Sequence, residues 1–441
     1  MGGRRPSRRG AGIVLAGLVL GAGIAWAAVA PATHRGRDGR DLVARGAYLA
    51  RAGDCMSCHT RAGGEPLAGG RAIPTPFGTL YSPNITPDRE TGIGNWSAAD
   101  FRRAMHEGID ADGHALYPAF PYTSYTRVTR RDLDAIWAWL RTVPAVHRAD
   151  TPHRMRFPFG WRALLAGWRA LYFDAGEFTP PANRSEAYRR GAYLVEGLGH
   201  CGECHTPRNR FGATEDDREL RGGMIPVQDW YAPDLGTAEG NGLHGWTRRD
   251  IVDFLKHGRS SRGMAYGPMA EVVRNSTQYL DDADLEAIAT YLLEHPSLPS
   301  KHTARRFQPD AAVAAGKRRL DRHVASGREI YRHHCADCHG RDGRGKPNVY
   351  PALAGNTSLL AAEPVNAIRA VLLGGFAPAT EAWPRPYSMP PFIQRLDDAE
   401  VADVVTYIRH AWGNRPQGGQ TDAVVRRQTV GRYRSTFTHR Q

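Results

Sequence analysis

The sequence has no cysteine to spare for a structural disulfide. Its 441 residues include six cysteines, and each belongs to a Cys-x-x-Cys pair that is followed directly by histidine. A fold that depends on disulfide bonds is therefore excluded. The three motifs are Cys55-Met-Ser-Cys58-His59, Cys201-Gly-Glu-Cys204-His205 and Cys335-Ala-Asp-Cys338-His339.

A motif for binding RNA or DNA is also missing, although the formal net charge is +13. The arginines are dispersed among acidic residues, so most of this charge is expected to be a solvated surface, and no nucleic-acid partner is predicted. Two local excesses stand out: Arg4 to Arg9, and a basic C-terminal tail at 416–441. Each is suited to contact anionic headgroups or a protein partner, and disorder is the simpler expectation for the tail.

One uncharged stretch, from Ala11 to Ala30, follows the N-terminal arginines. It is long for the apolar region of a signal peptide and short for a comfortable membrane span, and Ala27 and Ala30 end sequences that resemble cleavage sites. Residues 1–30 are therefore predicted to be a signal peptide or a membrane anchor. In both cases the rest of the chain is exported to the periplasmic side of the cytoplasmic membrane.

An internal repeat organises the remainder of the chain. A helical segment precedes each motif, and each repeat closes with a helix that carries aromatic residues on one face: Thr129 to Val143, Asp281 to Glu294 and Asp397 to Trp412. Ser97 to Gly108 and Thr247 to Gly258 add a capped helix to the first two repeats. These patterns predict an all-α chain of three tandem globules, at 40–145, 185–297 and 322–415.

The motif itself predicts covalent haem. Two thiols three positions apart form thioether bonds to the vinyl groups of haem c, and the adjacent histidine ligates the iron. A thioredoxin-like redox pair would need a βαβ context, and a zinc site would need four ligands in one place. The predicted attachment residues are Cys55, Cys58, Cys201, Cys204, Cys335 and Cys338, with His59, His205 and His339 as iron ligands of three haem c groups.

The second axial ligand is expected from the loop before each closing helix. Met269 lies in Tyr266-Gly-Pro-Met269 of the second repeat, and Met389 lies in Tyr387-Ser-Met389 of the third. Both methionines neighbour a proline, so we predict that they ligate the second and third irons, with Met264 in reserve for the second. Thioether ligation opposite histidine raises the reduction potential, which suits electron transfer.

The first repeat departs from this pattern, because Phe120 occupies the place of the methionine. Phenylalanine cannot bind iron. Met105, His106 and His114 are the nearest substitutes, and Met105 is preferred slightly over the two histidines. The remaining alternative is an open or water-filled position on the first iron.

Several longer stretches resemble the triheme cytochrome c subunits of membrane-bound periplasmic dehydrogenases. They include Thr75 to Pro87, Gly197 to Gly202, Cys204 to Asn209 and Gly267 to Val273, and the resemblance covers roughly residues 40 to 415. It implies three class I cytochrome c-like domains and a catalytic partner of the quinoprotein, flavin or molybdenum type. Phe120 points towards the molybdenum type, since the alcohol dehydrogenase subunits usually have methionine there.

The resemblance also implies a relay. Electrons from the dehydrogenase catalytic subunit would pass among the haems to ubiquinone or a terminal oxidase, in association with the membrane, and no catalytic residue is needed. A haem peroxidase, or a cytochrome that binds small ligands at an open first haem, is the alternative from a different class. A free-standing diffusible carrier fits less well with three large domains and an apolar N-terminus.

Overall fold

The computed structural model describes residues 39–238, 242–295, 311–347, 349–416 and 424–438. The predicted signal peptide or anchor at 1–30 lies outside these residues. Within them the chain is mostly helical, with several short strands. No helix in this described part combines the length and the apolar character needed to cross a bilayer.

The same helix pair occurs in each of the three repeats. The helix before the motif packs against the closing helix: α1 (Gly39–Ala52) on α5 (Arg130–Leu140), α7 (Glu186–Ala192) on α11 (Asp282–Glu294), and α12 (Ala311–His334) on α16 (Asp398–His410). A glycine stands at each crossing, where a Cβ atom would run into the backbone of the partner helix. These glycines are Gly46, Gly191 and Gly327, which face Ala135, Ala287 and Asp403.

The capped helices begin and end as their sequences predict. α3 (Ala98–Glu107) and α9 (Arg248–His257) each start with a capping box, formed by Ser97 with Asp100 and by Thr247 with Asp250. Each box satisfies backbone N–H groups that the first helical turn leaves without a partner. Both helices end at a glycine with positive φ, Gly108 and Gly258, which closes the last turn.

Short strands accompany the helices that the sequence predicts. The strands lie in the loops between helices, and the longest of them have four residues. The strands are β1 (Ala72–Thr75), β2 (Gly78–Tyr81), β3 (Arg154–Met155), β4 (Gly223–Ile225), β5 (Trp230–Ala232), β6 (Arg259–Ser260), β7 (Gly263–Met264), β8 (Gly375–Phe376) and β9 (Ser388–Met389). β1, β2 and β3 form one antiparallel sheet, and the others pair as β4–β5, β6–β7 and β8–β9.

The remaining helices are short. Besides the motif helices α2 (Cys55–His59), α8 (Gly202–His205) and α13 (Ala336–His339), the structure contains α4 (Tyr122–Tyr125), α6 (Leu164–Tyr172), α10 (Pro268–Asn275), α14 (Thr357–Leu360), α15 (Val365–Leu373) and α17 (Arg427–Thr438). A π-helical turn, η1 (Tyr193–Leu198), extends α7, and η2 (Asp216–Arg218) and η3 (Thr277–Tyr279) are 3₁₀ turns.

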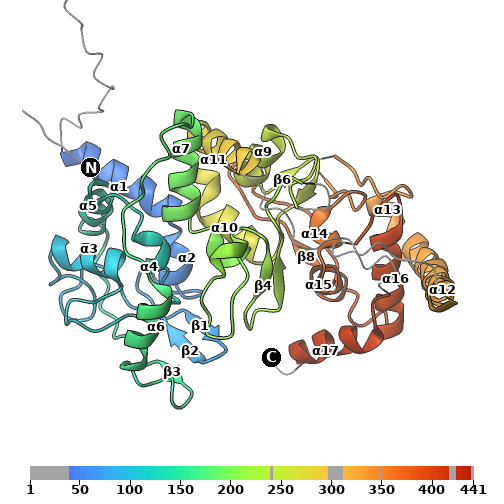
Figure 1. Ribbon diagram of the computed structural model, residues 1–441, viewed down its shortest axis with the longest axis horizontal. Coiled ribbons are helices and arrows are strands. Elements are labelled where there is room, and N and C mark those ends of the chain that lie inside the picture. Colours follow the sequence, from blue (N-terminus) through green and yellow to red (C-terminus); the bar gives the residue numbers. More distant parts are fainter. Residues whose placement is uncertain (1–38, 239–241, 296–310, 348, 417–423, 439–441) are drawn as a thin grey trace, which may run out of the picture.

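The hydrophobic core of the described residues consists of two clusters of buried side chains. The first and second repeats share one continuous cluster of buried side chains, while the third repeat has a cluster of its own. Figure 1 shows the second repeat, in green and yellow, between the first and the third. The second repeat also contacts the third, since Asn366 of α15 exchanges two hydrogen bonds, of 2.9 and 2.7 Å, with the backbone of Tyr231.

The C-terminal tail does not follow the expectation of disorder over 424–438. Its helix α17 packs against α15 and α16, and Val425, Val430 and Tyr433 are buried in the cluster of the third repeat. Arg434 donates a hydrogen bond of 2.6 Å to Asp398 at the start of α16. The basic composition of the tail gave no sign that these three apolar side chains would pack against the third repeat.

Candidate haem-binding sites

Each motif forms a single helical turn that ends at its histidine, in α2, α8 and α13. All six thiols are free in the structure, so none forms a disulfide. Burial raises the pKa of Cys55, Cys201 and Cys335 to about 12, so these side chains are neutral thiols. Neutral thiols held beside a histidine fit the donor set for covalent attachment of haem c.

All three histidines are oriented by the same contact. Nδ1 lies 2.9 Å from the carbonyl oxygen of Pro83 for His59, 2.7 Å from that of Pro233 for His205, and 3.0 Å from that of Pro351 for His339. A carbonyl only accepts hydrogen bonds, so Nδ1 carries the proton and Nε2 keeps a lone pair for a metal. Burial lowers the pKa of each histidine, which favours the neutral ring that binds iron.

A glycine completes this contact in every repeat. The N–H groups of Gly69, Gly222 and Gly345 donate to the histidine carbonyls at 2.7, 2.7 and 2.8 Å. Each glycine has φ near +70°, and a Cβ there would press on the chain at or beside the clamping proline. Only glycine meets both demands, because it adopts positive φ freely and occupies no extra space. The histidine, glycine and proline are called the His–Gly–Pro clamp below.

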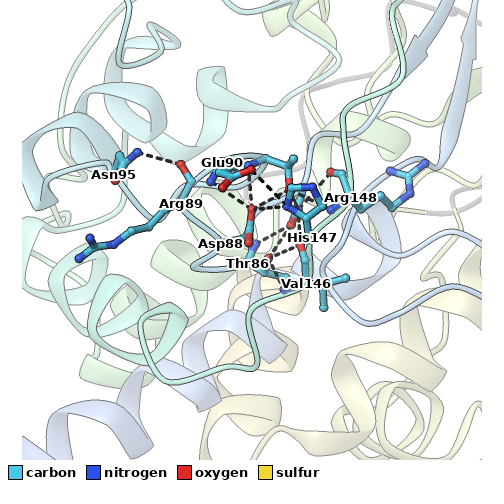
Figure 2. A network of polar contacts seen from close by, with 10 residues as sticks. Thr86, Asp88, Arg89, Glu90, Asn95, Val146, His147 and Arg148 are labelled. Atoms are coloured by element: carbon cyan, nitrogen blue, oxygen red, sulfur yellow. Dashed lines mark hydrogen bonds and ion pairs between the residues drawn. The ribbon is translucent and has the colours of Figure 1, made fainter.

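A polar network holds the loop that supplies Pro83. The Asn84 side chain donates to the Val146 carbonyl at 2.8 Å, and its oxygen accepts from the Thr86 N–H at 3.0 Å. Figure 2 shows Thr86 in contact with Val146 and Asp88 in contact with His147, in the segment that follows the first closing helix. The chain after the first repeat therefore folds back and fixes the proline that orients His59.

The first two motifs lie at the interface between their repeats. Ser57, inside the first motif, accepts a hydrogen bond of 2.8 Å from Asn275 of α10. In the converse arrangement Glu203, inside the second motif, accepts one of 3.0 Å from Thr123 of α4. Each motif thus contacts a short helix of the other repeat, α10 for the first motif and α4 for the second.

A buried carboxyl group lies at this interface. Burial raises the pKa of Asp54 to about 7, and the Ser57 hydroxyl donates a 2.6 Å hydrogen bond to it. Arg71 pairs with Glu271 nearby, with a 2.9 Å hydrogen bond from Nη2, and also donates to the Ser57 carbonyl at 2.5 Å. Next to burial, the charge of Asp54 is the largest influence that raises the pKa of Cys58.

The predicted distal methionines occupy two kinds of position. Met269 lies in the first turn of α10 and Met389 in β9, and both side chains are partly buried. The hairpins give a second correspondence: Met264 pairs with Arg259 and Met389 pairs with Gly375, each beside the glycine that ends the preceding helix. The repeats can therefore be aligned in two ways. The hairpin pairing places Met264 of the second repeat at the position of Met389 in the third. The position in the loop places Met269 of the second repeat at the position of Phe120 in the first.

The candidates of the first repeat differ in their surroundings. Met105 is 6% exposed and belongs to the shared core. His106 is held by a 2.6 Å contact between its Nε2 and the Val128 carbonyl, and the side chain of His114 is 61% exposed beside Asp110. Phe120 packs on Tyr125 with ring centroids 5.4 Å apart. Of the three substitutes for a methionine ligand, Met105 alone has a buried side chain without such a polar contact.

Sequence reasoning missed the clamping prolines and glycines. The prolines follow their histidines by 24, 28 and 12 residues, so no fixed spacing marks them. A signal does exist in two repeats, because Tyr81-Ser-Pro83-Asn84 resembles Tyr231-Ala-Pro233-Asp234.

Comparison with known proteins also indicates a cytochrome c. The sequence matches the cytochrome c family over residues 43–144 and 324–412. It is 38% identical over 413 residues to the cytochrome c subunit of a quinone-type alcohol dehydrogenase from Gluconobacter oxydans, covering 91% of this chain and 85% of that protein. It is 40% identical to the cytochrome c subunit of gluconate 2-dehydrogenase from Pantoea cypripedii, covering 85% of this chain and 86% of that protein. It is 42% identical to one of the subunits of nicotinate dehydrogenase from Pseudomonas putida, covering 89% of this chain but 32% of that protein.

Proposed function

Because this chain belongs to the family of cytochrome c subunits of dehydrogenase complexes and so carries covalently bound haem c, we propose that it is a triheme electron relay. It accepts electrons from a dehydrogenase catalytic subunit and passes them to ubiquinone or a terminal oxidase. The relay works on the periplasmic side of the cytoplasmic membrane, as three tandem cytochrome c domains within residues 40–415.

The observation that carries this proposal is the threefold His–Gly–Pro clamp. The second repeat lies outside both matches to the cytochrome c family, yet its His205 has the same contacts as His59 and His339. Equal surroundings for the three histidines support equal roles. The count of three haems rests on this equivalence.

Haem c, when bound, supplies a reversible one-electron couple at iron. The protein's own groups decide how that couple is tuned. The proline carbonyl fixes the ring of each histidine and increases its basicity as a ligand. Met269 and Met389 are the proposed opposite ligands in the second and third repeats, and Met105 is proposed for the first.

The arrangement of the repeats supports a linear path. The second repeat contacts the first through the two motifs and contacts the third through β5 and α15 (Figure 1). β5 leads directly into Pro233, which orients His205. The second haem would thus occupy the middle of the relay.

The relatives do not single out one substrate, since their names include alcohol, gluconate and nicotinate dehydrogenases. The catalytic partner is therefore proposed only as a quinoprotein, flavin or molybdenum dehydrogenase. Two candidate acid–base groups of the first repeat do not support peroxidase chemistry: His106 is bound to a backbone carbonyl, and the side chain of His114 is largely exposed beside Asp110. A peroxidase would use an acid–base group at the open face of its haem.

The testing experiment is mild isolation of the chain from its own membrane background. We expect three haems per chain by pyridine haemochrome, and a co-purifying dehydrogenase whose substrate reduces all of them. The double variant Cys201→Ala/Cys204→Ala should reduce the count to two, which tests the second repeat separately. If the protein purifies alone, with a high-spin haem that turns over peroxide, it is a haem peroxidase and the relay proposal is wrong.

A further inference from the structure

Apolar side chains gather on one exposed segment of the chain. Phe157, Phe159, Trp161, Leu164 and Leu171 are five of the eleven large apolar residues that are exposed in the described structure. Phe157 is 80% exposed and Leu171 is 74% exposed. The four residues Phe157, Trp161, Leu164 and Leu171 are called the apolar edge below.

Helix α6 is oriented with apolar residues towards solvent. Its Leu165 is buried, and Trp168 and Arg169 pack towards Tyr122. The exposed positions inside the helix carry no charge: Leu164, Ala166, Gly167, Ala170 and Leu171. A surface helix in water normally presents its polar face outward. At one end of this segment the Phe157 and Trp161 rings lie against each other, with centroids 5.1 Å apart. Exposed apolar side chains gathered in this way are typical of an interaction site.

The apolar edge is held in place by ordered contacts. The Phe159 ring lies 4.8 Å from Phe77, and its carbonyl accepts a 3.1 Å hydrogen bond from the Tyr117 hydroxyl. Arg162 donates to the Ala115 carbonyl at 3.0 Å. The aromatic rings of Phe157 and Trp161 therefore project from a fixed turn.

The positive charge of this segment indicates that its partner surface is anionic. Residues 151–173 contain four arginines and no aspartate or glutamate. Arg154, Arg156 and Arg162 are exposed around the apolar edge. Aromatic and aliphatic side chains framed by cations are the composition that settles at the interface of an anionic bilayer. Figure 1 shows β3 and the chain after it at the lower, projecting margin of the molecule, a shape suited to entering a headgroup layer.

We propose that the apolar edge rests in the interface of a bilayer containing anionic phospholipid. The inference rests on the proposed function, in which electrons leave towards ubiquinone or a terminal oxidase at the membrane. Phe157 and Trp161 enter the headgroup region, and the surrounding arginines contact lipid phosphates. The chain then has a docking surface of its own, independent of residues 1–30.

The test places a nitroxide label on the haem-loaded full chain through Phe157→Cys. The matched control is Phe376→Cys in the third repeat, where the native residue is also 74% exposed. On addition of phosphatidylglycerol–phosphatidylcholine vesicles, the label at 157 should lose accessibility to a water-soluble nickel chelate and gain accessibility to oxygen. The label at 376 should change little. Because the readout involves no electron transfer, it can fail while the relay stands, and the relay can fail while it succeeds.

Two outcomes would overturn the proposal. In one, the label at 157 remains as accessible to the nickel chelate with vesicles as without them. In the other, it is shielded only when the dehydrogenase catalytic subunit is added in detergent, which would make the apolar edge a protein interface. As a second measurement, the triple variant Phe157→Ser/Trp161→Ser/Leu171→Ser, labelled at Arg154→Cys, should lose the vesicle-induced protection that the singly labelled Arg154→Cys protein shows.

Discussion

The hydroxyl of Tyr48 donates a 2.6 Å hydrogen bond to Asp284, across the boundary between the first and second repeats. The converse contact is also present, since Tyr193 of the second repeat donates to Asp132 of the first at 2.8 Å. Each hydroxyl further accepts a backbone N–H at the start of the facing closing helix, from Asp281 at 3.3 Å and from Thr129 at 3.2 Å. The two repeats are thus joined by a reciprocal pair of tyrosine–aspartate hydrogen bonds. The third repeat has Glu329 in place of this tyrosine.

Loss of these hydrogen bonds should destabilise the first two repeats together. We expect Tyr48→Phe and Tyr193→Phe each to lower the free energy of unfolding by about 1.5–3 kcal/mol, the range for a hydrogen bond to a charged group. Burial, and then the neighbouring carboxylate, raises the pKa of both tyrosines, so both hydroxyls remain donors at neutral pH. Guanidinium unfolding followed at the haem bands measures the change.

The matched control is Tyr331→Phe, which removes a 2.7 Å hydrogen bond to the Gly340 carbonyl inside the third repeat. It should shift the transition of the third haem and leave the other two in place. Independent transitions for the first and second haems in the unaltered protein would contradict the shared core.

Two glycines of the third repeat separate backbone strain from the function of the clamp. Gly345 and Gly355 have φ of +66° and +71°, but a Cβ on Gly345 would lie 2.6 Å from the Pro351 carbonyl oxygen, whereas one on Gly355 meets open space. Gly355→Ala should cost about 1 kcal/mol of stability and leave the third haem potential unchanged. Gly345→Ala should displace Pro351, free Nδ1 of His339 and lower haem incorporation at the third motif. Equal haem content and potentials in the two variants would show that the clamp does not tune the haem.

Local chemistry was readable from the sequence, and long-range contacts were not. The capping residues Ser97 and Thr247 and the glycines that end α3 and α9 predict both helices to the residue, because caps act on their own first and last turns. The Cys-x-x-Cys-His motif is likewise local, because its two thiols and its histidine lie within one helical turn. Tyr48 and Asp284 are 236 positions apart, and only the folded chain brings them together.

The remaining differences have similar physical causes. The core shared by the first two repeats arises from side chains such as Leu198, which comes close to Gly53 across the boundary, and no repeat pattern encodes that contact. The tail helix α17 was hidden because Val430 and Tyr433 are diluted by arginines. The prolines of the clamp lie in loops whose lengths differ among the repeats.

Asp54 should make the potential of the first haem depend on pH. Its pKa of about 7, raised mainly by burial, means that the carboxyl is protonated below pH 7 and ionised above it. The charges that face it are Glu271 and Arg71. An added negative charge beside the haem attachment stabilises ferric iron, so the potential should fall as pH rises from 6 to 8. The slope should stay below about 59 mV per pH unit, the limit for one proton and one electron.

Asp54→Asn tests this dependence with little structural change. Asparagine tolerates the left-handed conformation of residue 54, at φ +50°, and still accepts the hydrogen bond from Ser57. Spectroelectrochemical titration should show a higher and flatter potential for the first haem, with that of the third haem unaltered. A flat profile for the first haem in the unaltered protein would remove Asp54 as the group responsible.

The ligand of the second iron can be decided by a pair of conservative variants. Met269→Leu should remove the sulfur ligand, turn the second haem high-spin and lower its potential by on the order of 100 mV, since axial ligands set haem potentials over a range of about 0.8 V. Met264→Leu should leave the ligation intact, because leucine preserves the volume in β7. Redox titration with magnetic circular dichroism measures both effects, and Met389→Leu provides the positive control in the third repeat. If Met264→Leu produces the loss instead, the hairpin register shared with Met389 identifies the ligand, and α10 then has the role of packing against the first motif.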